Sequence, residues 1–223
     1  MQYLCGVMKP MLLLVALFCI APSAMHAQWA VGLTGYVHTV GLSGDVPDEQ
    51  TFTSALGFGG GLSLVWSATS DVDVTIGGLL DRRSVTISNV LPLTDSLEKV
   101  GELSMTAYAI PVGVRIYAAS RRWYFSSGVI FRMESKDEIE VVGQDTSTSV
   151  NGAFRDLEVG VYLGVGYRFN LGNVQLLPEL RYEQGLTNIY EGQPTSTLPP
   201  APVLRSSGLS VRFSAEYAFG GDE

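Results

Sequence analysis

Apolar and polar side chains alternate with a period of two along eight segments of this chain, and this alternation constrains the fold more than any other feature. The clearest segment is 157–169, where seven consecutive odd-numbered positions from Leu157 to Phe169 are apolar. Residues 209–219 repeat the pattern at six positions, from Leu209 to Phe219. Because neighbouring side chains of a strand point to opposite faces, the pattern predicts strands with two different faces. A soluble sandwich can bury such a face as well, so alternation alone does not distinguish a soluble sandwich from a membrane barrel.

The second face of these strands is charged, with both signs mixed along it. Its charged residues are Asp73, Asp81, Arg83, Arg115, Arg132, Glu134, Glu158, Arg168, Glu179, Arg181, Glu183, Arg212 and Glu216. A cation that faces the middle of a lipid bilayer costs about 2–4 kcal/mol, so in a membrane barrel these residues would face the lumen. We expect a structural charge network there, formed by Asp73, Arg115, Arg132, Glu158, Arg168, Glu179, Arg181, Arg212 and Glu216.

The predicted connections alternate in length. Residues 67–71, 118–121 and 170–173 read as tight turns, whereas 41–56, 89–102, 135–153 and 185–206 read as long polar loops. Short periplasmic turns and long outer loops produce this rhythm in outer-membrane barrels. The sequence therefore predicts an all-β fold, an eight-stranded antiparallel up-and-down transmembrane β-barrel with its long loops outside. Pro111 and Pro178 fall inside predicted strands, and we expect a bulge or local distortion at each.

The first residues have the features of a secretory signal. Lys9 precedes the apolar run 11–20, and small residues follow up to Ala27. We expect residues 1–27 to be a signal peptide for the general secretion route and residues 28–223 to form one outer-membrane barrel domain. Both cysteines, Cys5 and Cys19, lie in the leader, so the mature chain would have neither a disulfide nor a thiolate metal site.

Two segments of the chain resemble the PorT-like outer-membrane β-barrel domain family. Residues 109–117, Ala-Ile-Pro-Val-Gly-Val-Arg-Ile-Tyr, are similar to its Ile-Pro strand, and residues 179–189 are similar to its Arg-Tyr and Gly-Leu-Thr-Asn pattern. The resemblance covers essentially residues 28–220 and implies an eight-stranded barrel. The family has no shared catalytic motif, and its namesake serves a secretion apparatus. Outer-membrane barrels usually end on an aromatic residue, whereas four residues follow Phe219 here.

The composition offers little chemistry. A net charge of −8 argues against nucleic acid as a partner, because phosphate binding needs a basic face. We expect no catalytic, cofactor or metal site: His38 would be the one histidine of the mature chain, and we interpret it as a solvated residue at the rim. If it did catalyse, Ser43 or Asp45 across a loop would be its partner. Arg121 and Arg122 lie in a predicted periplasmic turn near lipid headgroups.

The sequence therefore predicts a non-catalytic barrel with a plugged lumen, because the interior of eight strands just fits side chains. Tyr124 and Tyr162 would help to fill it. The function would be that of a membrane scaffold, a surface-binding protein or a secretion accessory. Its partners would be outer-membrane lipid, lipopolysaccharide, and a protein bound by the outer loops or the periplasmic rim. The alternatives are a lipid-modifying enzyme that uses His38 and a narrow pore.

Overall fold

The chain forms a single closed sheet. The computed structural model describes residues 28–44, 50–90, 97–141, 147–149, 156–189 and 203–219. Its strands are β1 (Gln28–Gly44), β2 (Gln50–Thr69), β3 (Val72–Val90), β4 (Leu97–Tyr117), β5 (Trp123–Val141), β6 (Ser147–Ser149), β7 (Leu157–Tyr167), β8 (Phe169–Leu171), β9 (Val174–Gly185) and β10 (Leu204–Phe219). Within these segments no helix is long and apolar enough to cross a membrane.

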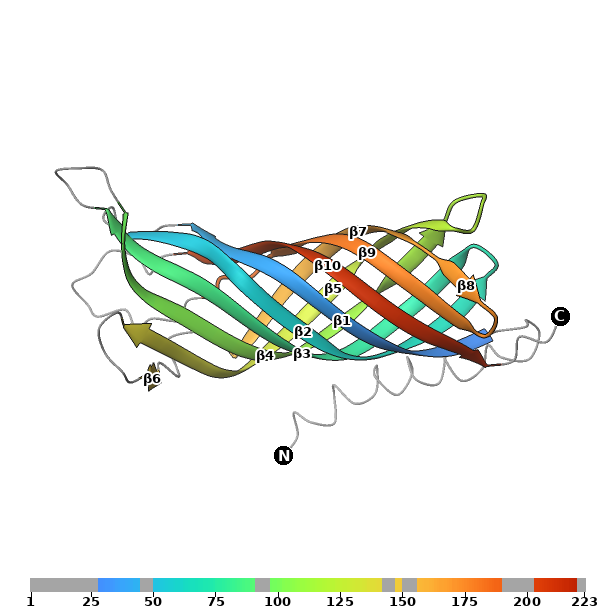
Figure 1. Cartoon of the computed structure of the whole chain (residues 1–223), viewed down its shortest axis with the longest axis horizontal. Helices are drawn as coiled ribbons and strands as arrows, with labels where there is room; N and C mark the ends of the chain where they lie inside the picture. Colours follow the sequence, from blue (N-terminus) through green and yellow to red (C-terminus); the bar gives the residue numbers. More distant parts are fainter. Residues whose placement is uncertain are drawn as a thin grey trace, which may run out of the picture.

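The sheet closes because its last strand pairs with its first. Each of the long strands β1, β2, β3, β4, β5, β7, β9 and β10 pairs antiparallel with its neighbours in this order, and β10 returns to β1. The short β8 pairs β9 in the same register as β7 does, so β7 and β8 form one wall strand interrupted at Arg168. The predicted eight-stranded up-and-down barrel is confirmed, and Figure 1 shows it from the side.

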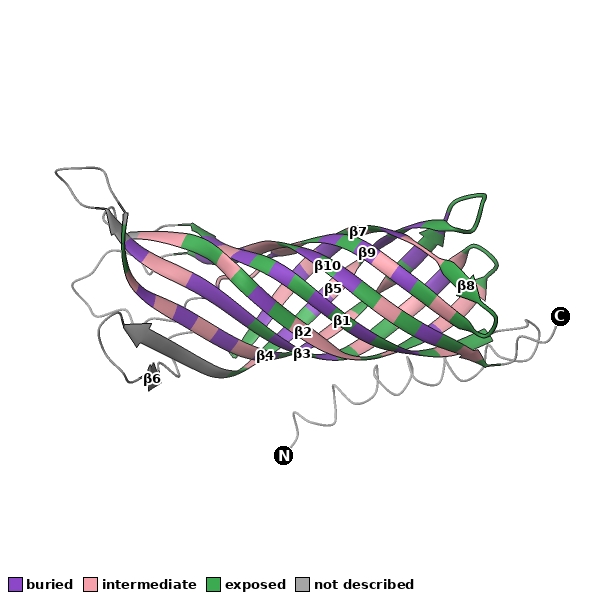
Figure 2. Ribbon diagram, viewed as in Figure 1, coloured by how far each residue is buried: buried purple, intermediate pink, exposed green. Residues whose placement is uncertain are grey.

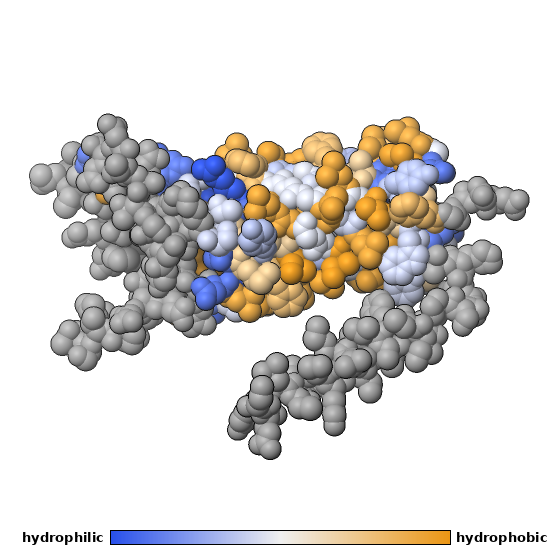
Figure 3. Space-filling view, turned by 90° about the horizontal axis from the view of Figure 1, so that it is seen from below, coloured by the Kyte–Doolittle hydropathy of each residue, from blue (hydrophilic) through white to orange (hydrophobic). Residues whose placement is uncertain are grey.

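Burial alternates along the strands as the sequence predicts. In β1 the side chains from Gly32 to Val40 alternate strictly between buried and exposed, and the banding in Figure 2 repeats this around the wall. Many of the exposed positions carry large apolar side chains, for example Leu33, Phe58, Leu163 and Phe213. Figure 3 shows apolar side chains gathered in a band across the face of the barrel in view. Such a belt is the surface that lipid chains cover in a membrane barrel.

The connections divide the barrel into two ends. The turn end has the tight connections 70–71, 118–122 and 172–173, and it also holds the paired residues Trp29 and Phe219. At the last turn, Gly172 adopts a positive φ of 66°, which glycine tolerates without strain. The other end, the loop end, has the connections between β1 and β2, β3 and β4, β5 and β7, and β9 and β10 (Figure 1).

The strands extend further into the predicted loops than the sequence indicates. The long connections shrink because β1 runs to Gly44, β3 runs to Val90 and β5 runs to Val141. The wall is also uneven at the loop end, since β4 has 21 residues and β7 has 11. These segments were predicted to be loops because they are polar. Strands that extend beyond the apolar belt face water on the outside, so polarity there does not mark a loop.

The two strand prolines interrupt the ladder without shifting it. Opposite Pro111, the β3–β4 pairs stop at Ile76 and resume at Leu79 in the same register. Opposite Pro178, the pairs of β9 stop at Glu179 and resume at Leu176, again in register. The expected distortion is therefore a gap in the ladder, whereas the register shifts lie elsewhere, for instance between Thr106 and Ala107.

The interior at the loop end is apolar, which the sequence analysis did not foresee. A cluster of buried side chains fills it: Leu42, Val85, Leu103, Met105, Ile189 and Leu204. The main-chain N–H of Ile189 donates to the carbonyl of Leu204 at 2.9 Å and holds the segment after β9 over this cluster. The polar lumen is therefore confined to the middle and the turn end of the barrel.

Candidate functional site in the barrel interior

Eight of the nine residues of the predicted charge network are buried inside the barrel. They are Asp73, Arg115, Arg132, Glu158, Glu179, Arg181, Arg212 and Glu216. Arg168 differs, because it is half-buried at the turn end and its guanidinium lies over the ring of Tyr117, 4.1 Å from the centroid. Its Nε donates to the carbonyl of Arg121 at 3.0 Å, so Arg168 belongs to the mouth of the barrel.

The middle of the interior holds two arginines, each shared between carboxylates. Arg83 Nη1 donates to Glu158 Oε2 at 2.6 Å, from β3 to β7. Arg132 Nε donates to Asp81 Oδ2 at 3.1 Å, and its Nη2 contacts Glu183 on the other side. These contacts join strands that are not neighbours in the wall, so the side chains bridge the lumen.

His38 belongs to this middle layer, and its interpretation as a solvated rim residue is wrong. It is 4% exposed and lies edge-on to the ring of Tyr36. Its Nε2 lies 3.4 Å from Asp81 Oδ1, and the hydroxyl of Tyr36 donates to the same oxygen at 3.0 Å. Ser43, the partner considered for it, donates instead to the carbonyl of Arg205, and Asp45 lies outside the described residues.

A second layer lies nearer the turn end. Arg115 on β4 donates to both carboxylate oxygens of Glu216 on β10, at 2.7 and 2.9 Å. Arg181 Nε donates to Glu179 Oε1 at 2.5 Å. Tyr124 donates to the same carboxylate at 3.1 Å, and Ser126 adds a further bond. The second predicted tyrosine, Tyr162, is buried under the guanidinium of Arg181, 3.8 Å from the ring centroid.

Glycines in the wall make room for these rings. A Cβ atom on Gly166 would lie 2.2 Å from the Tyr124 ring, and one on Gly113 would lie 2.1 Å from the Tyr162 hydroxyl. The rings therefore lie directly against the bare backbone of the neighbouring strands, where any side chain would displace them.

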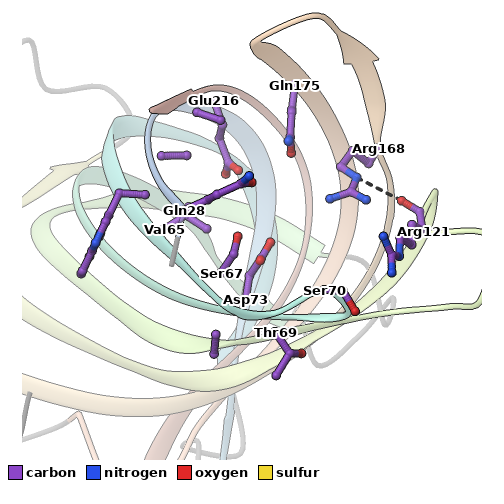
Figure 4. Close-up of a pocket in the computed structure, with 14 residues that line it drawn as sticks. Gln28, Val65, Ser67, Thr69, Ser70, Asp73, Arg121, Arg168, Gln175 and Glu216 are labelled. Carbon is purple, nitrogen blue, oxygen red and sulfur yellow. Dashed lines mark hydrogen bonds between the residues drawn. The ribbon is translucent and has the colours of Figure 1, made fainter. Parts of the chain in front are cut away.

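The turn end opens into a polar cavity of about 560 Å³ (Figure 4). Its walls include Gln28, Ser67, Ser70, Asp73, Arg121, Arg168, Gln175 and Glu216. Asp73 forms part of its floor and accepts a hydrogen bond from the Tyr117 hydroxyl at 2.7 Å. We call this cavity the turn-end cavity. Glu216, which belongs to the second layer, lines it as well.

Asp81, Arg83 and Glu183 lie on the predicted charged face but were not part of the predicted network. Asp81 and Arg83 lie an even number of positions from Asp73 along β3, and Glu183 lies an even number from Glu179 along β9. Positions two apart in a strand share a face, so this spacing could have assigned all three to the network. Tyr36 and His38 follow the same rule along β1. Alternation therefore identifies which side chains point inward, whereas the pairing partners depend on register. Among the described residues, no three histidine, cysteine or acidic side chains are grouped so as to hold a metal ion.

A family model agrees with this architecture. The family model for the outer membrane protein beta-barrel domain matches residues 22–191. Among solved structures, the chain is similar to Neisserial surface protein A, with 15% identity, a TM-score of 0.48 and coverage of 85% of this chain and 99% of that one. It is also similar to OprG from Pseudomonas aeruginosa, with 11% identity, a TM-score of 0.47 and coverage of 86% of this chain and 95% of that one. A third similar structure is Ail from Yersinia pestis, with 15% identity, a TM-score of 0.42 and coverage of 87% of this chain and 100% of that one. No curated protein sequence matches the chain.

Proposed function

We propose that this chain, which belongs to the family of outer membrane protein β-barrel domains, is a closed, non-catalytic barrel. We propose further that it binds a protein partner at its periplasmic end. The family locates the chain in the outer membrane. The finer role is that of a scaffold or secretion accessory, and the resemblance of residues 109–117 and 179–189 to PorT-like proteins supports it.

The observation that carries the proposal is the layered obstruction of the lumen. The ion pair between Arg115 and Glu216 joins β4 to β10, which are four places apart in the ring of eight and therefore opposite each other. Above this pair, Arg132 and Arg83 bridge further strands, and the apolar cluster follows at the loop end. A solute that crosses the barrel would have to break buried charge pairs, which is costly.

Conductance in planar lipid bilayers tests the closed lumen. The refolded wild-type barrel is expected to insert without producing steps of ionic current. Resistance of the barrel to added protease in the same lipid verifies insertion, because a folded and inserted barrel is protected from cleavage. Stable current steps from the wild type would instead establish the narrow pore.

The lipid-modifying alternative depends on His38, whose surroundings leave no room for a substrate. The cavity beside it is lined by Arg83, Arg132 and Glu183 among others, and it measures about 10 Å³. That volume holds at most one water molecule. We expect the lipid A profile of cells to be unchanged by deletion of the gene and by His38→Ala. A modified lipid A species that vanishes in both strains would overturn the proposal in favour of an enzyme.

The turn-end cavity is the surface that we propose for the partner. It is wide enough for a peptide side chain or loop, and its walls offer both donors and acceptors, including Gln28, Gln175 and Arg121. A photo-crosslinking residue at Ser70 or Gln175 is expected to capture a periplasmic or membrane protein in living cells. The matched control carries the same crosslinker at exposed Ser43, at the loop end. If Ser70 and Gln175 yield only the adducts that Ser43 yields, the accessory role is wrong.

A further inference from the structure

The outer face of the strands β3, β4 and β5 changes from apolar to polar at one row of residues. On the apolar side of this change, Leu80 pairs with Tyr108, and Tyr108 pairs with Met133. All three side chains are large, apolar and exposed. Large apolar side chains on the outside of a membrane barrel lie against lipid chains. We call these three residues the apolar row, and it is the last such row toward the loop end on these strands.

The next row toward the loop end is cationic. Arg82 pairs with Thr106, and Thr106 pairs with Lys136. Arg82 is exposed, and within the described part of the chain its guanidinium forms no ion pair. Neighbouring strands lie about 4.8 Å apart, so the backbones that carry the two cationic residues are about 10 Å apart across the wall. We call these three residues the outer cationic row.

A β-bulge brings Lys136 into this row. The pairing of β4 with β5 shifts by one residue between Thr106 and Ala107, and Ser135 is the extra residue. The hydroxyl of Ser135 donates to the carbonyl of Thr106 at 3.0 Å and holds the bulge. In an unshifted ladder Ser135 would take the outer place opposite Thr106, and position 136 would fall on the inner face. The bulge therefore places a second cationic residue on the outside of the barrel.

The height of the outer cationic row matches the boundary of a bilayer. Arg82 lies ten residues from the start of β3 at Val72, which is about 33 Å along the strand. At a strand tilt of about 40° this distance corresponds to a height of about 25 Å, the usual height of the apolar band of outer-membrane barrels. With the loop end outside, as the sequence predicts, the row lies at the level of the lipid headgroups of the outer leaflet.

Positive charge at this boundary is a local feature of the face formed by β3, β4 and β5. On the outer face of β1, β9 and β10 the polar part toward the loop end begins with the uncharged residues Thr39, Gln184 and Ser207. On β5 itself, Glu138 lies in the row that follows the outer cationic row. Two positive charges thus stand against one negative charge there, and the positive ones lie nearer the lipid.

We propose that the outer cationic row binds one phosphate group of lipopolysaccharide, while the acyl chains of the same molecule lie along the apolar row. A guanidinium can donate two parallel hydrogen bonds to a phosphate, and an ammonium adds a second positive charge. The ligand is a lipid because the wall directly beneath the row is the part that lipid chains cover. The site lies at the opposite end of the barrel from the turn-end cavity, so it does not depend on the proposed protein partner.

Native mass spectrometry of the refolded mature barrel in a non-ionic detergent tests the recognition of phosphate. The probes are lipid A, which carries the phosphates of lipopolysaccharide, and the same lipid after its phosphates have been removed. The wild-type barrel is expected to bind lipid A about thirtyfold more tightly than the dephosphorylated lipid, which is the combined contribution of two cations at a headgroup. Equal affinities for the two lipids would overturn the proposal.

Variants locate the effect. Arg82→Gln with Lys136→Gln is expected to bind lipid A about thirtyfold more weakly and to bind the dephosphorylated lipid as the wild type does, which also shows that it is folded. The matched control, Lys99→Gln with Arg205→Gln, removes two positive charges at exposed positions elsewhere at the loop end and is expected to keep the wild-type affinity. The proposal is wrong if the first variant keeps full affinity for lipid A or if the control loses as much.

A photo-crosslinking residue at Tyr108, in the apolar row, identifies the lipid in living cells. It is expected to yield an adduct that reacts with an antibody to lipopolysaccharide and that is lost when Arg82 and Lys136 are replaced by glutamine. The same crosslinker at Thr39, an exposed position on β1, is the control and is expected to yield much less of this adduct. A phospholipid adduct at Tyr108 in place of lipopolysaccharide, or equal lipopolysaccharide adducts at both positions, would overturn the proposal.

Discussion

Arg115 and Glu216 form a two-point ion pair that crosses the barrel from β4 to β10, with N–O distances of 2.7 and 2.9 Å. The two residues are 101 positions apart in the chain and project from opposite sides of the wall. Arg115 is paired in the sheet with Asp73 and Ser126, and Glu216 with Gly32 and Gln175. The pair therefore ties together two strands that share no hydrogen-bonded ladder.

Breaking this pair from one side is expected to destabilise the barrel strongly. Glu216→Ala leaves a buried arginine without its carboxylate, which costs about 3–5 kcal/mol. The double variant Arg115→Met with Glu216→Leu removes both charges and is expected to unfold near the wild-type midpoint. Urea titration of the refolded barrel measures both. The exposed pair of Lys99 and Glu102 is the control, because Lys99→Met should change the free energy of unfolding by less than about 1 kcal/mol.

The contact between Gly166 and Tyr124 predicts an effect of a single methyl group. In Gly166→Ala the new Cβ would lie 2.2 Å from the ring, which forces Tyr124 away from Glu179 and costs about 1–3 kcal/mol. Near-ultraviolet circular dichroism should report the displaced ring. In Gly35→Ala, by contrast, the new Cβ has no atom within 4 Å, so stability should be unchanged or slightly higher. Equal losses in both variants would contradict the packing.

The apolar belt predicts a depth-dependent penalty for charge on the outer face. Leu33 is 64% exposed and lies five residues from the start of β1 at Gln28, about 17 Å along the strand. Leu33→Arg is therefore expected near the middle of the bilayer, at a cost of about 2–4 kcal/mol in lipid vesicles. Thr39→Arg, further along the same face, should cost about 0–1 kcal/mol. In detergent micelles the difference between the two should shrink.

The orientation in the outer membrane can be tested with single cysteines, because both natural ones lie in residues 1–27. Ser43→Cys at the loop end should react with a membrane-impermeant maleimide on intact cells. Ser70→Cys at the turn end should react only after the outer membrane is permeabilised. Labelling of Ser70→Cys on intact cells would show that the barrel is inverted or not inserted.

Much of the fold was predictable from the sequence. The period of two identified every wall strand and the inward face, and eight residues of the predicted network are buried. Strand ends were not predictable: β5 continues through the polar segment 135–141, because polarity along the chain does not mark where a strand ends. The apolar cluster around Leu103 and Met105 was also missed, since apolar residues there point inward among polar neighbours.

The sequence by itself determined which side chains face lipid and which face the interior, because that division follows from strand parity and needs no knowledge of pairing. Only the tertiary structure decided which charged side chains pair with one another in the interior of the barrel. Register and closure bring Arg115 opposite Glu216, bury His38 beside Asp81 and bring Arg212 within 3.8 Å of Glu183. The physical reason is that lumen contacts join strands distant in the chain. Their geometry depends on the stagger of all eight strands at once, which no local pattern encodes.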